Sequence, residues 1–206
     1  MQKIGIFGGT FDPIHIGHIA MAIALKEAHH LDHIFFVPAR ANPHKHKGPS
    51  TAPQHRIHML RLALRQVPDC SILTLELKRT SPSPSPSYMI DTVLTLKSQK
   101  KFSNSQFFLL LGQDLLPQFS EWKSPHELIK LAPPLIAMRG AVPPAGTWQK
   151  DPALKKALIQ GMTDTPLFDV SATEIRQRIT RGLYCGHLLH QAVYRYIIKH
   201  KLYDHS

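Results

Sequence analysis

Residues 8–18 read Gly-Gly-Thr-Phe-Asp-Pro-Ile-His-Ile-Gly-His and stand between two apolar runs. The run before them, residues 3–7, predicts a strand that ends in a glycine turn. The run after them, residues 16–28, is rich in Ala, Ile, Leu and Met and predicts a helix. A second predicted strand at 33–38 completes a β-α-β unit, which crosses over right-handed into a parallel sheet. Residues 8–18 therefore lie at the carboxyl end of a parallel strand, where open α/β sheets bind ligands.

The alternation of strands and helices continues along the chain. Further strands are predicted at 72–77, 106–111, 135–138 and 167–170, and further helices at 52–65, 88–97, from 125, 153–159, 171–181 and 188–200. Residues 81–87 read Ser-Pro-Ser-Pro-Ser-Pro-Ser, which predicts an extended loop. The expected fold is α/β, a Rossmann-like doubly wound parallel sheet with a small C-terminal helical subdomain. We expect residues 1–182 to form the α/β domain and residues 183–206 a helical extension packed on it.

Composition limits the possible partners. Among 206 residues, 25 Lys and Arg stand against 14 Asp and Glu, so the net charge is +11 with histidine neutral. This surplus favours partners that carry phosphate, but it does not distinguish nucleic acid from nucleotide or anionic membrane. The hydrophobic content of 43% excludes a wholly disordered basic tail.

Two cysteines, Cys70 and Cys185, lie far apart and form no CxxC pair, which is typical of a reducing compartment. The first residues lack the apolar core of a signal peptide, and no apolar stretch is long enough to span a bilayer. We therefore expect a cytoplasmic protein without a membrane partner.

Residues 8–18 also carry groups suited to binding phosphate. Gly8 and Gly9 allow close approach of the backbone to a ligand, and the helix start offers unpaired N–H groups to an anion. His15 and His18 are three apart, so both rings can face the same phosphate from a first helical turn. The pattern matches neither GxGxxG nor the P-loop. Two histidines could also stand on a surface by chance, or bind zinc, although no third ligand lies nearby at a suitable spacing.

Two segments of the chain resemble motifs of a known family. Residues 8–18 resemble the HxGH motif of the nucleotidylyltransferase superfamily, and Val-Ser-Ala-Thr-Glu-Ile-Arg at 170–176 is similar to its ISxTxxR motif. The tetrapeptide HIGH at 15–18 also occurs in class I aminoacyl-tRNA synthetases. Within the superfamily the chain is similar to the bacterial nicotinate-nucleotide adenylyltransferases from residue 4 to about 180. Further matches in the order of that family are Asn42 to Lys45, His55-Arg56, Glu76 with Arg79, residues 87–92, and Gly112 to Asp114 with Leu116, Phe119 and Trp122.

The resemblance implies transfer of AMP from ATP to nicotinate mononucleotide, which forms deamido-NAD (nicotinate adenine dinucleotide) and pyrophosphate. The attacking phosphate oxygen is already ionised, so alignment and charge stabilisation suffice, with His15 and His18 as the catalytic residues. Mg²⁺ would be held by ATP phosphates and water, with no ligand from a protein side chain. The residues implied in ATP binding are Gly8, Gly9, Thr10, Phe11, His15, His18, Ser171, Thr173 and Arg176.

The motif at residues 170–176 indicates a function only together with the motif at residues 8–18. Ser171 with Glu174, like Thr51 with Gln54, forms a capping-box pattern, which by itself indicates only a helix start. By the resemblance, the hydroxyls of Ser171 and Thr173 would receive the β- and γ-phosphates, and Arg176 would neutralise the departing pyrophosphate.

A third set of residues would bind nicotinate mononucleotide. Lys45 would meet its phosphate, Trp122 would stack on the pyridine ring, and Asp114 would hydrogen-bond a ribose. From the residues alone, Lys45 could equally lie in a solvated loop, Arg56 on a helix surface and Trp122 in the core. Met89 stands where the family often has Thr, so recognition of the carboxylate there would fall to backbone N–H groups. The full set is Lys45, Arg56, Tyr88, Met89, Asp114 and Trp122.

Two other functions stay open on sequence grounds. The acceptor could be nicotinamide mononucleotide or phosphopantetheine, or the protein could be a basic RNA-binding module. A tRNA synthetase would need a KMSKS-like lysine loop and a much longer chain, so we expect no nucleic-acid partner. A homo-oligomer is compatible with the sequence.

Overall fold

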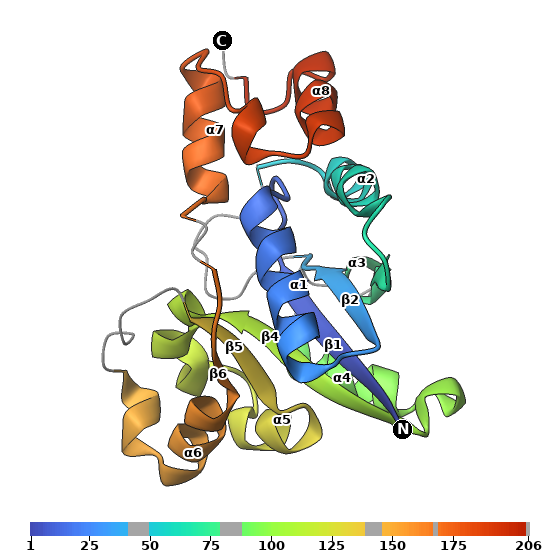
Figure 1. The fold of residues 1–206 in the computed structure, drawn as a ribbon, viewed down its shortest axis with the longest axis vertical. Coiled ribbons are helices and arrows are strands. Elements are labelled where there is room, and N and C mark those ends of the chain that lie inside the picture. The colour runs from blue at the N-terminus through green and yellow to red at the C-terminus, as the bar shows by residue number, and fades with distance from the viewer. Residues whose placement is uncertain (41–49, 79–87, 139–145, 167–168, 205–206) are drawn as a thin grey trace.

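The computed structural model describes residues 1–40, 50–78, 88–138, 146–166 and 169–204 (Figure 1). The basic loop with Lys45, the Ser-Pro run at 81–87 and the first part of the strand predicted at 167–170 fall on residues outside these ranges.

A parallel sheet forms the centre of the molecule. Its order is β3-β2-β1-β4-β5-β6, and every neighbouring pair is parallel. The chain winds outward in one direction from β1 and in the other from β4, so the order reverses between these two strands, as in a doubly wound fold. This confirms the predicted fold class. The strands are β1 (Gln2–Gly9), β2 (His33–Pro38), β3 (Cys70–Ile72), β4 (Ser105–Gly112), β5 (Pro134–Met138) and β6 (Met162–Asp164).

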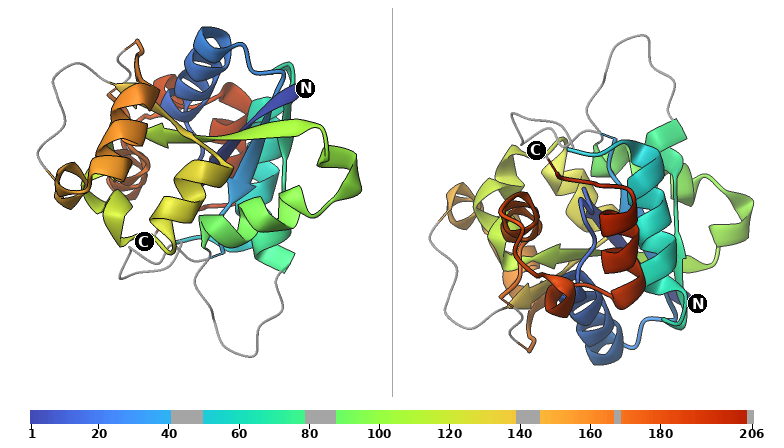
Figure 2. Two further views of the ribbon diagram at one scale, coloured as in Figure 1. Left: turned by 90° about the horizontal axis from the view of Figure 1, so that it is seen from below. Right: turned by 90° about the horizontal axis from the view of Figure 1, so that it is seen from above.

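Helices enclose the sheet in two layers (Figure 2). The α-helices are α1 (Ile16–His29), α2 (Pro53–Leu64), α3 (Leu75–Lys78), α4 (Met89–Lys97), α5 (Pro125–Leu131), α6 (Pro152–Gly161), α7 (Ala172–Thr180) and α8 (Gln191–Lys199). Short 3-10 segments cover Lys100–Phe102, Gln113–Glu121, Thr147–Lys150 and Gly186–Leu188.

Alternation along β1 assigns its side chains to two cores. Ile4 and Ile6 pack in one buried cluster with Val93 of α4, whereas Phe7 packs in another with Leu25 of α1. Successive side chains of a strand point to opposite faces, so a strand covered on both sides reads as a continuous apolar run. This explains why the carboxyl end of β1 sits at a fixed place between two helical layers.

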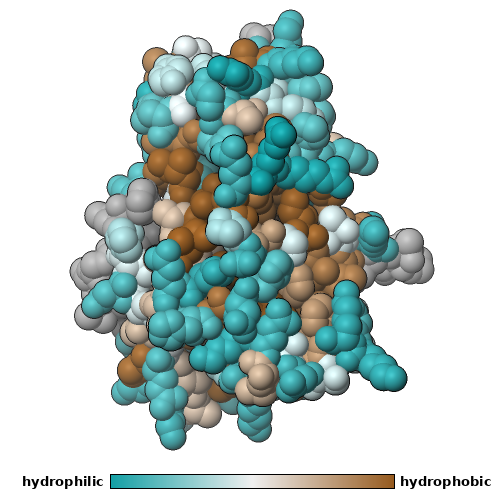
Figure 3. Space-filling model, turned by 45° about the vertical axis from the view of Figure 1, so that its right-hand side comes forward, coloured by the Kyte–Doolittle hydropathy of each residue, from teal (hydrophilic) through white to brown (hydrophobic). Residues whose placement is uncertain are grey.

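The C-terminal helices lie together at one end of the molecule. Figure 1 shows α7 and α8 above the carboxyl ends of the strands, with α8 beside α2. Val193 and Ile197 of α8 share a buried cluster with Met59 and Leu60 of α2. In Figure 3 hydrophobic side chains gather across the middle of the visible face, between this helical end and the rest of the molecule, which is largely hydrophilic. The domain boundary after residue 182 stays a prediction.

Two predicted strands are wrong. Residues 72–77 alternate like a strand, but only Cys70–Ile72 pair with β2, and Leu75–Lys78 form the short helix α3. The turn buries Glu76 at 2% exposure, where it accepts a hydrogen bond from the Thr92 hydroxyl (2.9 Å). The last strand is β6 at 162–164, and the described residues 169 and 170 are not in a strand. Local alternation does not tell how far an edge strand pairs.

Two helix starts also differ from the prediction. Thr51 does not cap α2, because its hydroxyl donates to Asp12 Oδ1 (2.5 Å) and Ala52 is the N-cap residue. A helix predicted from 188 to 200 is divided into the 3-10 segment Gly186–Leu188 and α8, which His190 caps by accepting from the N–H of Ala192 (3.2 Å).

Candidate active site

The turn between β1 and α1 is anchored in the core. Phe11 has a φ of 50°, and its buried ring packs against Phe7 (ring centroids 5.4 Å apart) and Phe36 (5.7 Å). The turn delivers the chain to α1, a helix of 14 residues. The first N–H groups of such a helix have no partner within the helix, and the positive end of its dipole faces the turn. The side chain of Phe11 serves packing, which leaves its backbone for a ligand.

His15 and His18 meet at the start of α1. Their ring centroids lie 3.7 Å apart with 32° between the planes, and the backbone N–H of His15 donates to Nδ1 of His18 (3.3 Å). A neutral ring that accepts at Nδ1 carries its proton on Nε2. His18 also packs against the ring of Phe11 (5.2 Å), and His15 is 4% exposed. The structure thus brings the two rings together, as their spacing predicts.

A pocket of about 270 Å³ opens between the carboxyl ends of β1 and β4. This is the point where the strand order reverses, and doubly wound proteins bind ligands there. One wall is formed by Gly8, Gly9 and Thr10 at the end of β1. The residues opposite come from α3, α4 and the segment after β4; among them are Glu76, Tyr88, Met89, Asp114, Trp122 and Lys123.

Two glycines leave room in this pocket. A β-carbon at Gly8 would lie 2.3 Å from Cε of Met89, and one at Gly112 would lie 2.4 Å from Oδ1 of Asp114. Both distances are far below van der Waals contact, so a larger residue would displace a pocket side chain. The glycines therefore allow Met89 and Asp114 to close on the end of the sheet.

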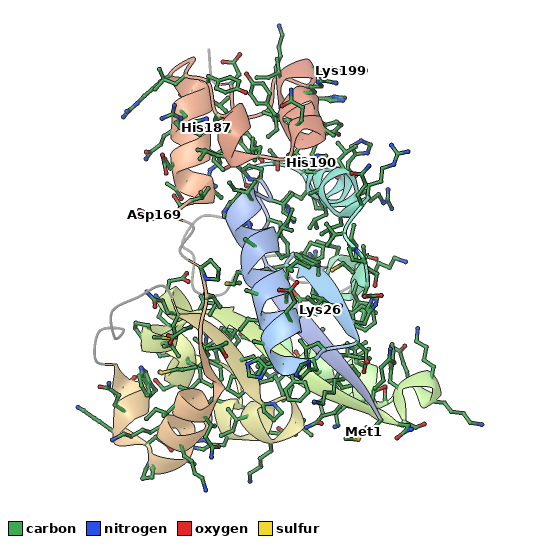
Figure 4. All side chains as sticks on the ribbon, in the orientation of Figure 1. Met1, Lys26, Asp169, His187, His190 and Lys199 are labelled. Atoms are coloured by element: carbon green, nitrogen blue, oxygen red, sulfur yellow. The ribbon has the colours of Figure 1, made fainter. Side chains whose placement is uncertain are left out.

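Helix α7 brings a second group of predicted residues to the same turn. Nη1 of Arg176 donates to the carbonyl of Asp12 (2.7 Å), and its Nη2 donates to Oγ1 of Thr173 (3.2 Å). Ser171 caps the helix by accepting from the N–H of Glu174 (3.1 Å). Figure 4 shows Asp169 below the start of α7, level with the beginning of α1. Residues 164 positions apart in sequence thus meet beside the histidine pair.

Comparison with known proteins gives these features a family. A family profile described as cytidylyltransferase-like matches residues 6–178. A probable nicotinate-nucleotide adenylyltransferase of Dictyoglomus thermophilum is 37% identical over 98% of this chain and all of its own length. The nicotinate-nucleotide adenylyltransferase of Bacillus subtilis is 35% identical over 99% of this chain and all of its own. This chain belongs to the nicotinate-nucleotide adenylyltransferase family.

A solved structure outside the bacteria shares the fold of this family member. The Plasmodium falciparum nicotinic acid mononucleotide adenylyltransferase complexed with NaAD superposes with a TM-score of 0.74 at 22% identity, covering 100% of this chain and 99% of the other. The same Plasmodium enzyme complexed with APC superposes with a TM-score of 0.73 at 22% identity. At this identity the likeness shows the fold.

Four of the six residues predicted to bind the acceptor in this adenylyltransferase line the pocket: Tyr88, Met89, Asp114 and Trp122. Trp122 packs beside Phe119 (ring centroids 5.1 Å apart). Lys45 lies outside the described residues. Of the residues predicted to bind ATP, Gly8, Gly9 and Thr10 line the same pocket, while His15, His18 and Arg176 cluster at the turn beside it.

Arg56 has a different place from the one predicted. Its side chain is fully buried, does not line the pocket, and donates from Nη1 to the carbonyls of Thr10 and Ala39 (both 2.8 Å). Burial lowers the pKa of Arg56, and Asp12 partly offsets that effect. Arg56 thus joins the segments that follow β1 and β2. A direct contact with the acceptor stays a prediction.

Sequence reasoning assigned no role to two pocket residues, Glu76 and Lys123. Glu76 is a nearly buried acid between Leu75 and Leu77, a pattern that sequence alone reads as one face of a strand. Nζ of Lys123 lies 3.0 Å from a carboxylate oxygen of Asp91 and 4.9 Å from the centre of the Tyr88 ring. The available signals for Glu76 were an acid inside an apolar run and its place among the matches to the family.

The described part of the chain contains no group of three His, Cys, Asp or Glu residues arranged to hold a metal ion. Within the same residues, none of the helices combines the length and the apolar character needed to cross a bilayer. Cys70 and Cys185 are free thiols, and burial raises the pKa of Cys70 to about 11.

Proposed function

We propose that this protein transfers AMP from ATP to nicotinate mononucleotide and releases pyrophosphate. One observation carries the proposal: a single pocket joins the glycine end of β1 to Tyr88, Met89, Asp114 and Trp122, beside the turn that bears His15, His18 and Arg176. Family membership supports the same reaction, because relatives over the full length carry the name nicotinate-nucleotide adenylyltransferase.

The chemistry needs little from the protein beyond positioning. A phosphate oxygen of nicotinate mononucleotide attacks the α-phosphorus of ATP, and the bond from that phosphorus to the β-phosphate oxygen breaks. The nucleophile is ionised at neutral pH, so no side chain has to remove a proton. Holding the two phosphates in line lowers the barrier by saving the entropy of alignment.

The α-phosphate would be met at the start of α1. The Nε2 proton of His18 and the backbone N–H groups of Gly9 and Thr10 would stabilise the charge that develops on its oxygens. Arg176 would take up the charge of the departing pyrophosphate. Described contacts occupy two of the five N–H groups of its guanidinium, so three are left for phosphate oxygens.

ATP would enter as its Mg²⁺ complex. Mg²⁺ keeps several waters and binds phosphate oxygens with few protein ligands, which suits a site without a carboxylate cluster among the described residues. The ion would neutralise phosphate charge during the displacement.

The acceptor would occupy the pocket with its pyridine ring against Trp122. The indole offers a flat apolar face to a planar ring, and Asp114 can accept a hydrogen bond from a ribose hydroxyl. Met89 offers no hydroxyl, so we propose that backbone N–H groups at the start of α4 recognise the carboxylate.

A pyrophosphate-release assay tests the proposal. Purified protein is incubated with ATP, Mg²⁺ and one acceptor at a time: nicotinate mononucleotide, nicotinamide mononucleotide or phosphopantetheine, with the product identified by mass spectrometry. We expect kcat/KM to be highest for nicotinate mononucleotide and the product to be nicotinate adenine dinucleotide. A higher kcat/KM for phosphopantetheine, or no product with either pyridine nucleotide, would refute the proposal.

A further inference from the structure

Asp12 lies at a buried junction of three distant segments. Its side chain is 3% exposed, and its carboxylate accepts hydrogen bonds from the Tyr203 hydroxyl (Oδ1, 2.7 Å), the Thr51 hydroxyl (Oδ1, 2.5 Å) and the Ser50 N–H (Oδ2, 2.6 Å). Its backbone carbonyl accepts from Arg176 (2.7 Å). A buried carboxylate needs such donors, because each unpaired oxygen would cost desolvation energy.

The four donors come from three parts of the chain. Ser50 and Thr51 lie just before Ala52, the N-cap residue of α2. Arg176 lies on α7, and Tyr203 follows α8 near the C-terminus. Tyr203 is 5% exposed, and burial followed by the neighbouring Asp12 raises the pKa of its hydroxyl well above the ordinary value, so it stays a donor. The C-terminal segment thus reaches the turn that contains His15.

The same turn is joined to both sets of residues proposed to act on the phosphates, the histidine pair and Arg176. Asp12 stands three residues before His15, within the turn that starts at Thr10, and its carbonyl fixes one N–H of Arg176. Arg56 supports the turn from the other side through the carbonyl of Thr10 (2.8 Å). A shift of the turn would therefore move the histidine pair and the guanidinium of Arg176 relative to each other.

We propose that Asp12 and Tyr203 are positioning residues for adenylyl transfer: hydrogen bonds to the Asp12 carboxylate from Tyr203, Thr51 and Ser50 hold the turn so that His15 and Arg176 converge on the same phosphate chain. The proposal rests on the proposed function and adds a role for the C-terminal segment. Misplacing a catalytic group by about 1 Å can cost roughly 10²-fold in rate, so a few hydrogen bonds here have kinetic consequences.

Tyr203→Phe and Thr51→Val each remove one donor and keep nearly the same shape. We expect each to lower kcat by about three- to tenfold, with the KM for the acceptor changed less than twofold, because the groups that would move are those proposed to contact the phosphates of ATP and not the acceptor. Thr51→Ser keeps the hydroxyl and should restore kcat to within twofold of wild type. Asp12→Asn turns an amide N–H₂ toward at least one donor and should lower kcat by roughly 10²-fold.

Tyr184→Phe is the matched control. Tyr184 lies in the same C-terminal segment but is 58% exposed and away from the turn, so its kcat should equal that of wild type. Thermal unfolding of every variant separates positioning from stability. If Tyr203→Phe and Thr51→Val lower the melting temperature but keep the wild-type kcat below that temperature, the residues are structural only and the proposal is overturned.

A binding measurement distinguishes this proposal from failure of the proposed function. The affinity of each variant for α,β-methylene ATP is measured by calorimetry, which needs no acceptor and no turnover. We expect Asp12→Asn and Tyr203→Phe to weaken binding by about threefold or more, through the displaced Arg176, and Tyr184→Phe to leave it unchanged. Unchanged affinity in the first two variants would overturn the positioning role, even if the wild type proves to use another acceptor.

Discussion

Two pairs of histidines in this protein have the same spacing and different surroundings. His15 and His18 begin α1 beside the glycine turn, and the centres of their tilted rings lie 3.7 Å apart. His55 and His58 also stand three apart, on α2, but each turns to Tyr196 of α8: Nδ1 of His55 lies 2.8 Å from the hydroxyl, and the ring of His58 stacks on Tyr196 at 4.4 Å. The spacing therefore brings two rings to one side of a helix, and the position of that helix in the fold decides what the rings contact.

The difference follows from the sheet. The first pair begins α1 at the carboxyl edge of β1, where the strand order reverses, and follows the turn whose first residue, Thr10, lines the pocket. The second pair lies on the side of α2 that faces α8, away from the carboxyl ends of the strands, and its contacts with Tyr196 pack the two helices together. Further histidines of the C-terminal segment, His187 and His190, lie high among the helices in Figure 4.

The largest expected effect separates these pairs by kinetics. His18→Ala removes the proposed donor to the α-phosphate and should lower kcat by about 10²- to 10³-fold, with little change in melting temperature. His58→Ala, the matched control from the second pair, should keep kcat within twofold. Steady-state kinetics with nicotinate mononucleotide check both. Normal turnover by His18→Ala would show that the first pair has no larger part in catalysis than the second.

The next effect concerns substrate binding beside the first pair. Trp122→Ala removes the flat wall of the pocket and should raise the KM for nicotinate mononucleotide roughly tenfold, while the KM for ATP changes less than threefold. Trp122→Phe keeps an aromatic face and should recover most of that loss. An equal rise in both KM values would show that Trp122 supports the fold of the site instead of the acceptor.

The site itself shows what sequence can predict. The apolar run at residues 3–7 predicted the strand, and the run that begins at Gly8 predicted the turn and the meeting of His15 with His18, because all of these depend on local spacing. The pairing of Arg176 with Asp12 joins residues 164 positions apart, and no local pattern encodes it. The resemblance to known motifs, not periodicity, predicted that Arg176 belongs to the same site as the motif at residues 8–18.

The wrong predictions for Thr51 and Glu76 have a common cause. Thr51 looked like a helix cap because it precedes Gln54 by three, yet its hydroxyl bonds a carboxylate from another segment. Glu76 looked like one face of a strand, yet it turns into the pocket on α3. In both cases a buried acid accepts a hydrogen bond from a threonine in another segment. Such tertiary contacts override the local sequence pattern.

The third effect tests the packing role of the second pair. Tyr196→Phe removes the hydroxyl that lies 2.8 Å from His55 and keeps the ring. We expect the free energy of unfolding to fall by about 1 kcal/mol and kcat to stay within twofold. Urea unfolding and steady-state kinetics measure the two quantities on the same sample. A large loss of kcat without loss of stability would give the second pair a part in catalysis.

The smallest effect uses a histidine that belongs to neither pair. Burial lowers the pKa of His33, with Asp69 partly opposing it, and its Nε2 lies 2.7 Å from the Ser71 hydroxyl. Because the folded state binds this proton less readily than the unfolded chain, the free energy of unfolding should fall as pH decreases through about 6.5. His33→Gln cannot be protonated and should reduce that fall by a few tenths of a kcal/mol, since the ring is only partly buried. Urea unfolding at pH 7.5 and 5.5 measures this decrease in the free energy of unfolding for wild type and variant. An identical decrease in both would mean that other groups account for the acid sensitivity. One such group is His29, whose pKa is also lowered by burial.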